Sequence, residues 1–167
     1  MSESEVQIKK LLQRVDTAWA AFQESYAGLP DTQVMEPGAI GEWSIKDILA
    51  HVTIWEEEAL KHLPLIIAGG RPPRYVTYGG IDAFNAHMIE QRRGLSLAEV
   101  RRHLEETHRR LLAFIQSAPA DQFTRETRAR RRLRLDTYGH YPLHAAAIQD
   151  WREGRALLGG ERLGQIG

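Results

Sequence analysis

The sequence predicts an all-α protein, an antiparallel four-helix bundle with an extra short helix and a long loop. Apolar side chains recur at steps of three and four residues in the long segments, which is the spacing of one buried helical face. No segment shows the sustained apolar and polar alternation of a half-buried strand. We therefore expect bundle helices at about 4–28, 44–67, 96–117 and 139–157.

The first predicted helix, 4–28, begins at a serine and ends at a glycine and a proline. Ser2 or Ser4 can cap its start, because a serine hydroxyl accepts an unpaired amide N–H of the first turn. Gly28 and Pro30 then end the helix. Its predicted buried face consists of Ile8, Leu11, Leu12, Val15, Trp19, Phe22, Tyr26 and Leu29.

The second predicted helix, 44–67, begins at a short version of the capping box, in which Ser44 and Asp47 bind each other's backbone amides. Its buried face consists of Ile45, Ile48, Leu49, Val52, Trp55 and Ala59. His51 falls within this stripe and is predicted to point inward, although a lone inward histidine is more often a hydrogen-bonded core residue than a ligand. Pro64 is predicted to kink or end the helix.

Residues 68–80 form a turn-rich connection, which we expect to border the functional site. Its length and its two aromatic residues, Tyr75 and Tyr78, motivate this expectation, and a plain surface loop is the alternative. A short helix from 81 to about 93 should follow, so that the stretch 68–94 caps or flanks the bundle. His87 in this helix has no evident partner.

The third predicted helix, 96–117, begins at a Ser-x-x-Glu capping box and buries Leu111. His108 lies one turn from two leucines of the apolar face, so we expect it to point inward. It is then either an auxiliary group of the site or an inward histidine that only resembles a ligand. His103 belongs to the charged face, and His62 of the second helix lies too far along the axis to share a centre with His51.

An arginine-rich run lies between the third and last helices. Because its arginines form no helical stripe and only one aromatic residue is near, we interpret it as a solvated loop rather than a nucleic-acid surface. Alternation over 132–135 predicts a brief extended segment there. An anionic substrate or cofactor remains an alternative partner for the run. The arginines are Arg125, Arg128, Arg130, Arg131, Arg132 and Arg134.

The last helix carries His140 and His144, which lie at i and i+4 and therefore on one face. Pro142 is tolerated only in a first turn, so the helix should start at about 138–141. Two such imidazoles can share a metal ion, and two hydrogen-bonded histidines near a helix start are the alternative. Tyr141 stands where the metalloprotease motif H-E-x-x-H has its glutamate. A third inward histidine, His51, favours the metal.

Composition excludes several classes of protein. The 22 basic and 22 acidic residues give no net charge, which argues against nucleic-acid and membrane-surface partners. With no cysteine, disulfides, thiolate catalysis and cysteine-bound metals are excluded. No apolar run approaches the ~20 residues of a membrane span, and the acidic start is no signal peptide. We expect a cytoplasmic protein with one domain, 1–160, and a flexible tail, 161–167.

Two stretches of the sequence resemble a known family. The segment WSIKDILAH, from Trp43 to His51, and the Trp55-Glu56 pair after it resemble the second-helix signature of the DinB/YfiT-like metalloenzyme superfamily. The segment YGHYPLH, ending at His144, is similar to the His-x-x-x-His of that superfamily's last helix. The pattern is most similar to the ClbS/DfsB-type four-helix bundle proteins, and it follows the helix order over nearly the whole chain.

The resemblance implies a site and a class of chemistry. In such proteins three histidines bind a divalent metal, commonly nickel or zinc, and by position these are His51, His140 and His144. Relatives include thiol-dependent transferases and isomerases, and a self-protection hydrolase. The resemblance thus implies a metal-dependent transferase or hydrolase that acts on small electrophilic molecules, with a low-molecular-weight thiol as a candidate cosubstrate.

The sequence leaves open the alternative function, the role of three glutamates and the partners. The alternative function is a non-catalytic, binding or stress-related bundle with a vestigial or structural metal site. Glu56, Glu57 or Glu58 is a candidate to orient a ligand or act as a base, and the sequence does not determine which one faces the site. No other catalytic or substrate-binding residue is assigned. A small-molecule substrate is the expected partner, and a homodimer is left open.

Overall fold

The computed structural model describes the backbone of residues 1–164 and the side chains of residues 1–155. The long helices are α1 (Glu3–Tyr26), α3 (Ile45–Ile67), α5 (Leu97–Ser117) and α8 (Tyr141–Gly164). The shorter elements are α2 (Asp31–Val34), the 3-10 turn η1 (Tyr75–Tyr78), α4 (Ile81–Arg92), α6 (Asp121–Thr124) and α7 (Arg128–Asp136). Within the described residues the one β-like feature is an isolated bridge between Ile40 and Trp43. The predicted all-α bundle is confirmed.

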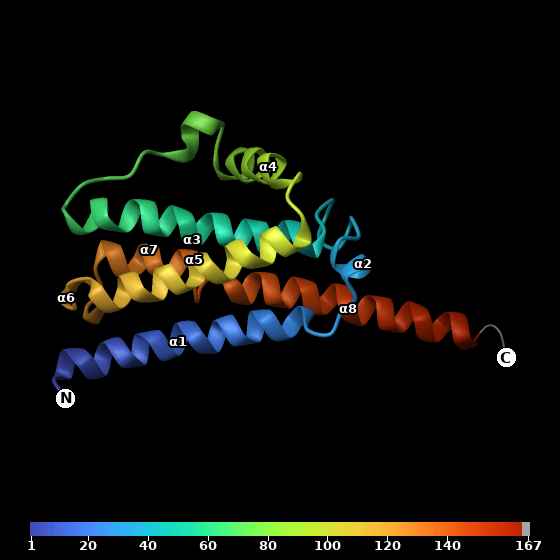
Figure 1. The fold of residues 1–167 in the computed structure, drawn as a ribbon, viewed down its shortest axis with the longest axis horizontal. Coiled ribbons are helices and arrows are strands. Elements are labelled where there is room, and N and C mark those ends of the chain that lie inside the picture. Colours follow the sequence, from blue (N-terminus) through green and yellow to red (C-terminus); the bar gives the residue numbers. More distant parts are fainter. Residues whose placement is uncertain (165–167) are drawn as a thin grey trace.

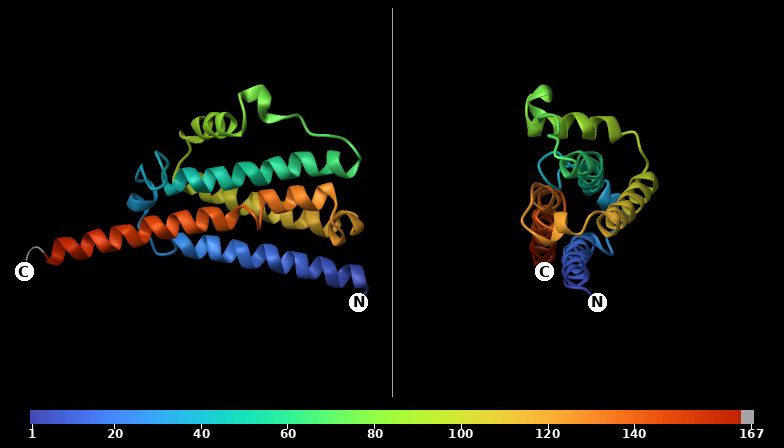
Figure 2. Two further views of the ribbon diagram at one scale, coloured as in Figure 1. Left: turned by 180° about the vertical axis from the view of Figure 1, so that it is seen from behind. Right: turned by 90° about the vertical axis from the view of Figure 1, so that its left-hand side faces the viewer.

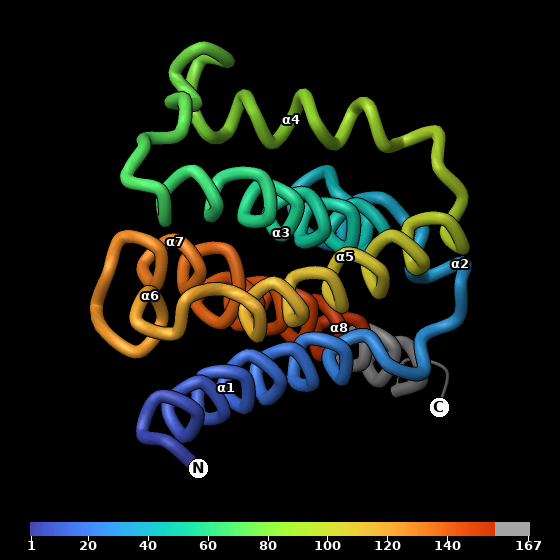
Figure 3. The backbone as a smooth tube through the Cα atoms, turned by 60° about the vertical axis from the view of Figure 1, so that its left-hand side comes forward, coloured from blue at the N-terminus to red at the C-terminus, as the bar shows by residue number. Residues whose placement is uncertain are grey.

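The four long helices pack as two pairs, α1 with α8 and α3 with α5 (Figures 1 and 2). The chain runs in one direction along α1 and α8 and in the opposite direction along α3 and α5 (Figure 1). Helices α3 and α5 can run the same way because the connection between them returns the chain along the bundle. That connection contains η1 and α4, and α4 packs on the outer side of α3 (Figure 3). The stretch 68–94 flanks the bundle as predicted.

Serine capping boxes begin three of the long helices, at Ser2, Ser44 and Ser96. At α3 the amide of Asp47 donates to Ser44 Oγ at 3.1 Å, and the amide of Ser44 donates to Asp47 Oδ2 at 3.0 Å. Such a cap contributes about 1 kcal/mol, because it satisfies amides that the helix leaves unpaired. These local bonds explain why the predicted starts of the helices are correct.

The core lies where the long helices meet, and Trp19 and Leu111 are buried in it as predicted. Trp55 was also predicted to be buried and is only partly so. Its indole packs against the core on one side and lines a surface pocket on the other, so the helical spacing identified its face correctly but not its exposure.

The interpretation of the arginine-rich run as a loop with an extended segment was wrong, because residues Arg128–Asp136 form helix α7. The Thr127 hydroxyl caps this helix by accepting the Arg130 amide at 3.0 Å. The buried residues Ala129, Leu133 and Asp136 follow at helical spacing. The alternation over 132–135 suggested an extended segment with both leucines on one face. In the helix, Leu135 lies on the face opposite Leu133 and is 69% exposed.

The ends of the helices otherwise differ little from expectation. Helix α3 continues through Pro64 to Ile67, and α8 begins at Tyr141, inside the predicted range. Helix α8 extends to Gly164, past the predicted end at 157. Of the expected tail 161–167, residues 165–167 lie outside the described residues. Among the described helices, none has both the length and the apolar character that crossing a membrane demands.

Candidate metal centre

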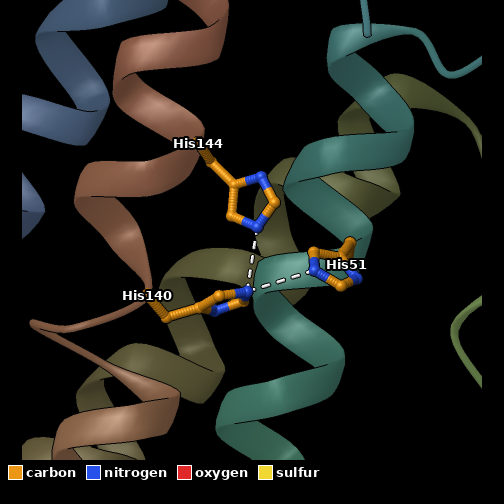
Figure 4. Close-up of side chains that lie close together, drawn as sticks. All are labelled: His51, His140 and His144. Atoms are coloured by element: carbon orange, nitrogen blue, oxygen red, sulfur yellow. Dashed lines mark hydrogen bonds between the residues drawn. The ribbon is translucent and has the colours of Figure 1, made fainter. Parts of the chain in front are cut away.

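Three imidazoles from two helical segments meet at one point, as Figure 4 shows. His51 projects from α3, His140 directly precedes α8, and His144 follows one turn later. The Nε2 atom of His140 lies 3.1 Å from Nε2 of His51 and 2.9 Å from Nε2 of His144. One candidate ligand atom from each residue lies within 4.8 Å of the others. The structure thus brings together the three histidines that the sequence singled out.

A tight turn between α7 and α8 positions His140. The Thr137 carbonyl accepts the amides of His140, at 2.7 Å, and Tyr141, at 2.8 Å, while the Gly139 amide donates to the Arg134 carbonyl at 2.8 Å. A Cβ atom at position 139 would lie 2.7 Å from the Arg134 carbonyl oxygen, closer than van der Waals contact allows. Glycine is therefore required at position 139 for the turn that presents His140.

Burial keeps the three imidazoles neutral. It lowers the pKa of His51 from 6.5 to about 2, with a further contribution from the neighbouring His144 and His140. Burial likewise lowers the pKa of His140 to about 3 and that of His144 to about 4. A neutral imidazole has a free lone pair, which is the form that binds a metal ion.

The donor atoms fit a divalent metal better than they satisfy one another. A neutral imidazole nitrogen carries either one hydrogen or one lone pair, so His140 Nε2 cannot form a well-aligned hydrogen bond with both neighbours. The Nδ1 atoms of His51 and His140 are buried without a partner among the described residues. Two ligands ~2.0–2.1 Å from a tetrahedral zinc lie about 3.3 Å apart, close to the observed Nε2 separations. Imidazole ligands suit zinc, nickel, copper and iron.

A pocket of about 300 Å³ opens beside the histidines, with His51 and His140 in its wall. A larger hollow of about 550 Å³ lies along α1, but the histidine cluster is not in its wall. The other lining residues of the 300 Å³ pocket are Trp55, Tyr75, Ile81, Asn85, Arg132, Leu135 and Asp136.

The long loop borders the pocket through one of its two aromatic residues. Tyr75 lies in the pocket wall, 5.2 Å from Trp55 between ring centroids, as predicted. Tyr78 instead packs against Phe84 and His87 and is 49% exposed. Both tyrosine rings pack against Phe84, but only Tyr75 lies in the pocket wall.

The three glutamates after His51 have different partners, and none of them lines the pocket. Glu57 pairs with Arg92 at 2.5 Å near the surface. Glu58 is buried, lies 3.0 Å from His62 Nε2 and accepts the Tyr75 hydroxyl at 3.0 Å. Glu56 is fully buried in the bundle. The suggestion that one of them acts directly on a ligand therefore finds no support in their positions.

Glu56 belongs to a second buried cluster, with His108 and Tyr141. Its Oε1 accepts the Tyr141 hydroxyl and lies 2.8 Å from His108 Nδ1, while the His108 ring stacks on Trp19 with centroids 3.7 Å apart. Burial raises the pKa of Glu56, and the bonds to His108 and Tyr141 oppose that rise. His108 points inward as expected and serves this cluster rather than the three-histidine centre.

Sequence reasoning assigned no role to three residues of the region: Tyr141, Asn85 and Asp136. Tyr141 was noted only as standing at the glutamate position of the metalloprotease motif, although its place beside His140 at the start of a helix is a signal for the site. Asp136 lies four residues after Arg132, the spacing of a helical ion pair, and the two bind at 2.6 Å. Asn85 accepts the Trp55 indole N–H at 2.8 Å, a pairing across 30 positions that no local pattern indicates. Of the other histidines, His87 is exposed and His103 is half-buried, away from the centre.

Comparisons with known proteins agree with this architecture. The family model of the DinB superfamily matches residues 14–148. The solved structure of "Sibling Lethal Factor Precursor - DfsB" is similar with a TM-score of 0.70 and 15% sequence identity, over 93% of this chain and 98% of that chain. At this identity the likeness shows the fold alone. No curated protein matches the sequence significantly. The chain belongs to the DinB superfamily.

Proposed function

We propose that this protein is a divalent-metal-dependent enzyme whose metal, zinc or nickel, is bound by His51, His140 and His144. We further propose that it acts on small electrophilic molecules, by transfer to a low-molecular-weight thiol or by hydrolysis. The observation that carries the proposal is the convergence of three neutral imidazoles, two of which, His51 and His140, lie in the wall of a pocket. Three protein ligands leave a coordination position free, where a metal ion lowers the pKa of a bound water or thiol, or polarises a carbonyl.

The residues of the pocket have separate tasks in this proposal. Trp55 and Tyr75 form an aromatic wall that excludes water and contacts the substrate. Asn85 keeps the Trp55 indole in place through the bond to its N–H. Asp136 also lines the pocket and is ion-paired with Arg132, whose Nε lies 2.6 Å from its Oδ2.

Metal analysis followed by a turnover screen tests the proposal. The chain is expressed without a histidine tag, purified without a nickel column, and its metal content is measured by mass spectrometry. We expect about one equivalent of divalent metal per chain, because three preformed ligands make a specific site. The loaded protein is then incubated with epoxides, alkyl halides, activated esters and strained rings, with and without low-molecular-weight thiols. His144→Ala should lose both metal and turnover, and His87→Ala should keep both.

Two results would contradict this proposal in different ways. A wild-type chain that takes up no zinc or nickel would refute the metal site. A stoichiometrically loaded chain that converts none of the electrophiles would instead support the non-catalytic alternative, in which the metal has a structural role.

A further inference from the structure

The pocket beside the histidines is built mainly from hydrocarbon surface. Trp55 and Tyr75 form one side with their rings tilted against each other, and Ile81 and Leu135 form the mouth. Aromatic and aliphatic walls favour ligands that bury apolar surface, because removing such surface from water is the main source of binding energy. The volume of about 300 Å³ lies at the lower end of ligand pockets, which limits the occupant to a small molecule.

The charged groups in the wall neutralise one another. Arg132 Nε donates to Asp136 Oδ2 at 2.6 Å, and a second nitrogen of the same guanidinium donates to the Tyr75 hydroxyl at 2.7 Å. Apart from this pair, the polar groups of the lining are neutral: the two imidazoles, Asn85, and the hydrogen-bonded Tyr75 hydroxyl and Trp55 N–H. A charged ligand would lose its hydration on entering and find no unpaired opposite charge in the wall, which is costly.

The mouth of the pocket continues the apolar surface outward. Ile81, on α4, is 55% exposed, and Leu135, on α7, is 69% exposed, yet both line the same pocket. Single exposed leucines or isoleucines are common on proteins and need no explanation. Here two exposed apolar side chains from separate elements lie at the mouth of one pocket. Together they form an apolar surface that can contact the part of a ligand extending beyond the pocket.

We infer that this site takes a small, electrically neutral and largely apolar molecule. Its one polar end points toward His51 and His140, and its hydrocarbon body lies between Trp55 and Tyr75 and against Ile81 and Leu135. This inference names the substrate class of the proposed function. Conversion of the bound molecule rests on that function, whereas its binding does not. Binding itself requires the pocket walls and not the metal.

Probe binding to the full-length chain tests this inference independently of the metal. After chelation, so that no carboxylate or amine can coordinate an ion, the chain is titrated with 1-butanol, 1-hexanol, hexanoate and hexylammonium. Affinity is measured by displacement of the neutral fluorescent probe N-phenyl-1-naphthylamine. The same titrations on the zinc-loaded chain report the contribution of the metal separately.

We expect 1-hexanol to bind roughly four- to sixteenfold more tightly than 1-butanol, since each buried methylene contributes about a two- to fourfold gain. Hexanoate and hexylammonium should bind about tenfold or more weakly than 1-hexanol. Leu135→Ser and Ile81→Ser should each weaken 1-hexanol severalfold without loss of folding, because both side chains are exposed. Leu65→Ser, at an exposed leucine of α3 away from the pocket, is the matched control and should change nothing.

Several outcomes would overturn the inference. These are tighter binding of either charged probe than of 1-hexanol, no binding of any probe, or equal effects of Leu135→Ser and Leu65→Ser. A change in sedimentation of Leu135→Ser without a change in probe binding would also overturn it, because the mouth would then be a contact between copies of the chain. A chain that fails to take up zinc can still be titrated with these probes. Failure of the proposed metal function is therefore distinguishable from failure of the inference about the ligand.

Discussion

The Tyr141 hydroxyl donates a hydrogen bond to Glu56 Oε1, which joins the first residue of α8 to the interior of α3. His140 directly precedes Tyr141, and His51 lies five residues before Glu56 on α3. The bond therefore connects the two segments that carry the three histidines. His108 of α5 approaches the same oxygen at 2.8 Å, so three helices meet at one buried carboxyl group.

Removing the Tyr141 hydroxyl should destabilise the fold. In Tyr141→Phe the buried Glu56 loses one of its two partners, which typically costs about 1–3 kcal/mol of unfolding free energy. Urea denaturation of the metal-free chain measures this. Tyr26→Phe is the control, because the Tyr26 hydroxyl forms no side-chain hydrogen bond within the described residues and the substitution should cost little. Equal unfolding free energies for the two variants would contradict the importance of the Glu56 bond.

Removing any one histidine of the centre should sharply lower the metal content. His51→Ala, His140→Ala and His144→Ala each leave two imidazoles, which hold a divalent ion weakly. Metal content per chain after dialysis against limiting zinc is the measurement. His87→Ala and His103→Ala should retain wild-type content, because neither residue belongs to the cluster. Full occupancy in all three single variants of the centre would refute the assignment of the ligands.

The metal-free chain should become less stable as the pH falls below about 6.5. Unfolded His51 binds a proton near its ordinary pKa of 6.5, whereas the folded residue, with a pKa of about 2, stays neutral. Unfolding therefore takes up a proton in this window, and acid favours the unfolded state. The contribution of His51 is fully present above pH 6.5 and is lost as the pH falls toward 2.

A His51→Asn variant isolates this contribution. Its unfolding free energy, measured by urea denaturation of chelated protein at pH 7, 6 and 5, should fall less steeply with acid than that of wild type. The slopes should differ by up to about 1.4 kcal/mol per pH unit, the linkage value for one proton. Identical slopes would show that His51 is not held neutral by burial.

The turn before α8 should not tolerate a side chain at Gly139. In Gly139→Ala the new Cβ meets the Arg134 carbonyl oxygen at 2.7 Å, so the turn must shift. Such overpacking costs about 1–3 kcal/mol, and it should also weaken zinc binding by displacing His140. Gly154→Ala, inside α8 with nothing within 4 Å, should instead stabilise by about 0.5–1 kcal/mol and leave zinc binding unchanged. Thermal unfolding and zinc titration of both variants measure the difference.

The elements that could be predicted from the sequence are those that local interactions determine. The capping boxes at Ser44 and Ser96 involve residues three apart, and their helices begin where expected. The i, i+4 spacing of His140 and His144 follows from helix geometry alone, and Pro142 restricts the start of α8. The inward position of His51 follows from its apolar stripe. That it can converge with His140 and His144 followed from these inward faces, and its assignment as a metal ligand came from the resemblance to a family.

The tertiary structure decided which side chains surround the histidines and what they bind. Glu56, Glu57 and Glu58 are consecutive in sequence, yet one joins a buried cluster, one a surface ion pair and one the Tyr75 hydroxyl. Apart from His62, which lies on α3 itself, the partners of these glutamates lie on α4, α5, α8 and the η1 turn. Pairings across such distances depend on how whole helices pack against one another. Local periodicity gives the face of each helix, whereas the neighbour of that face is set by the packing of segments far apart in the chain.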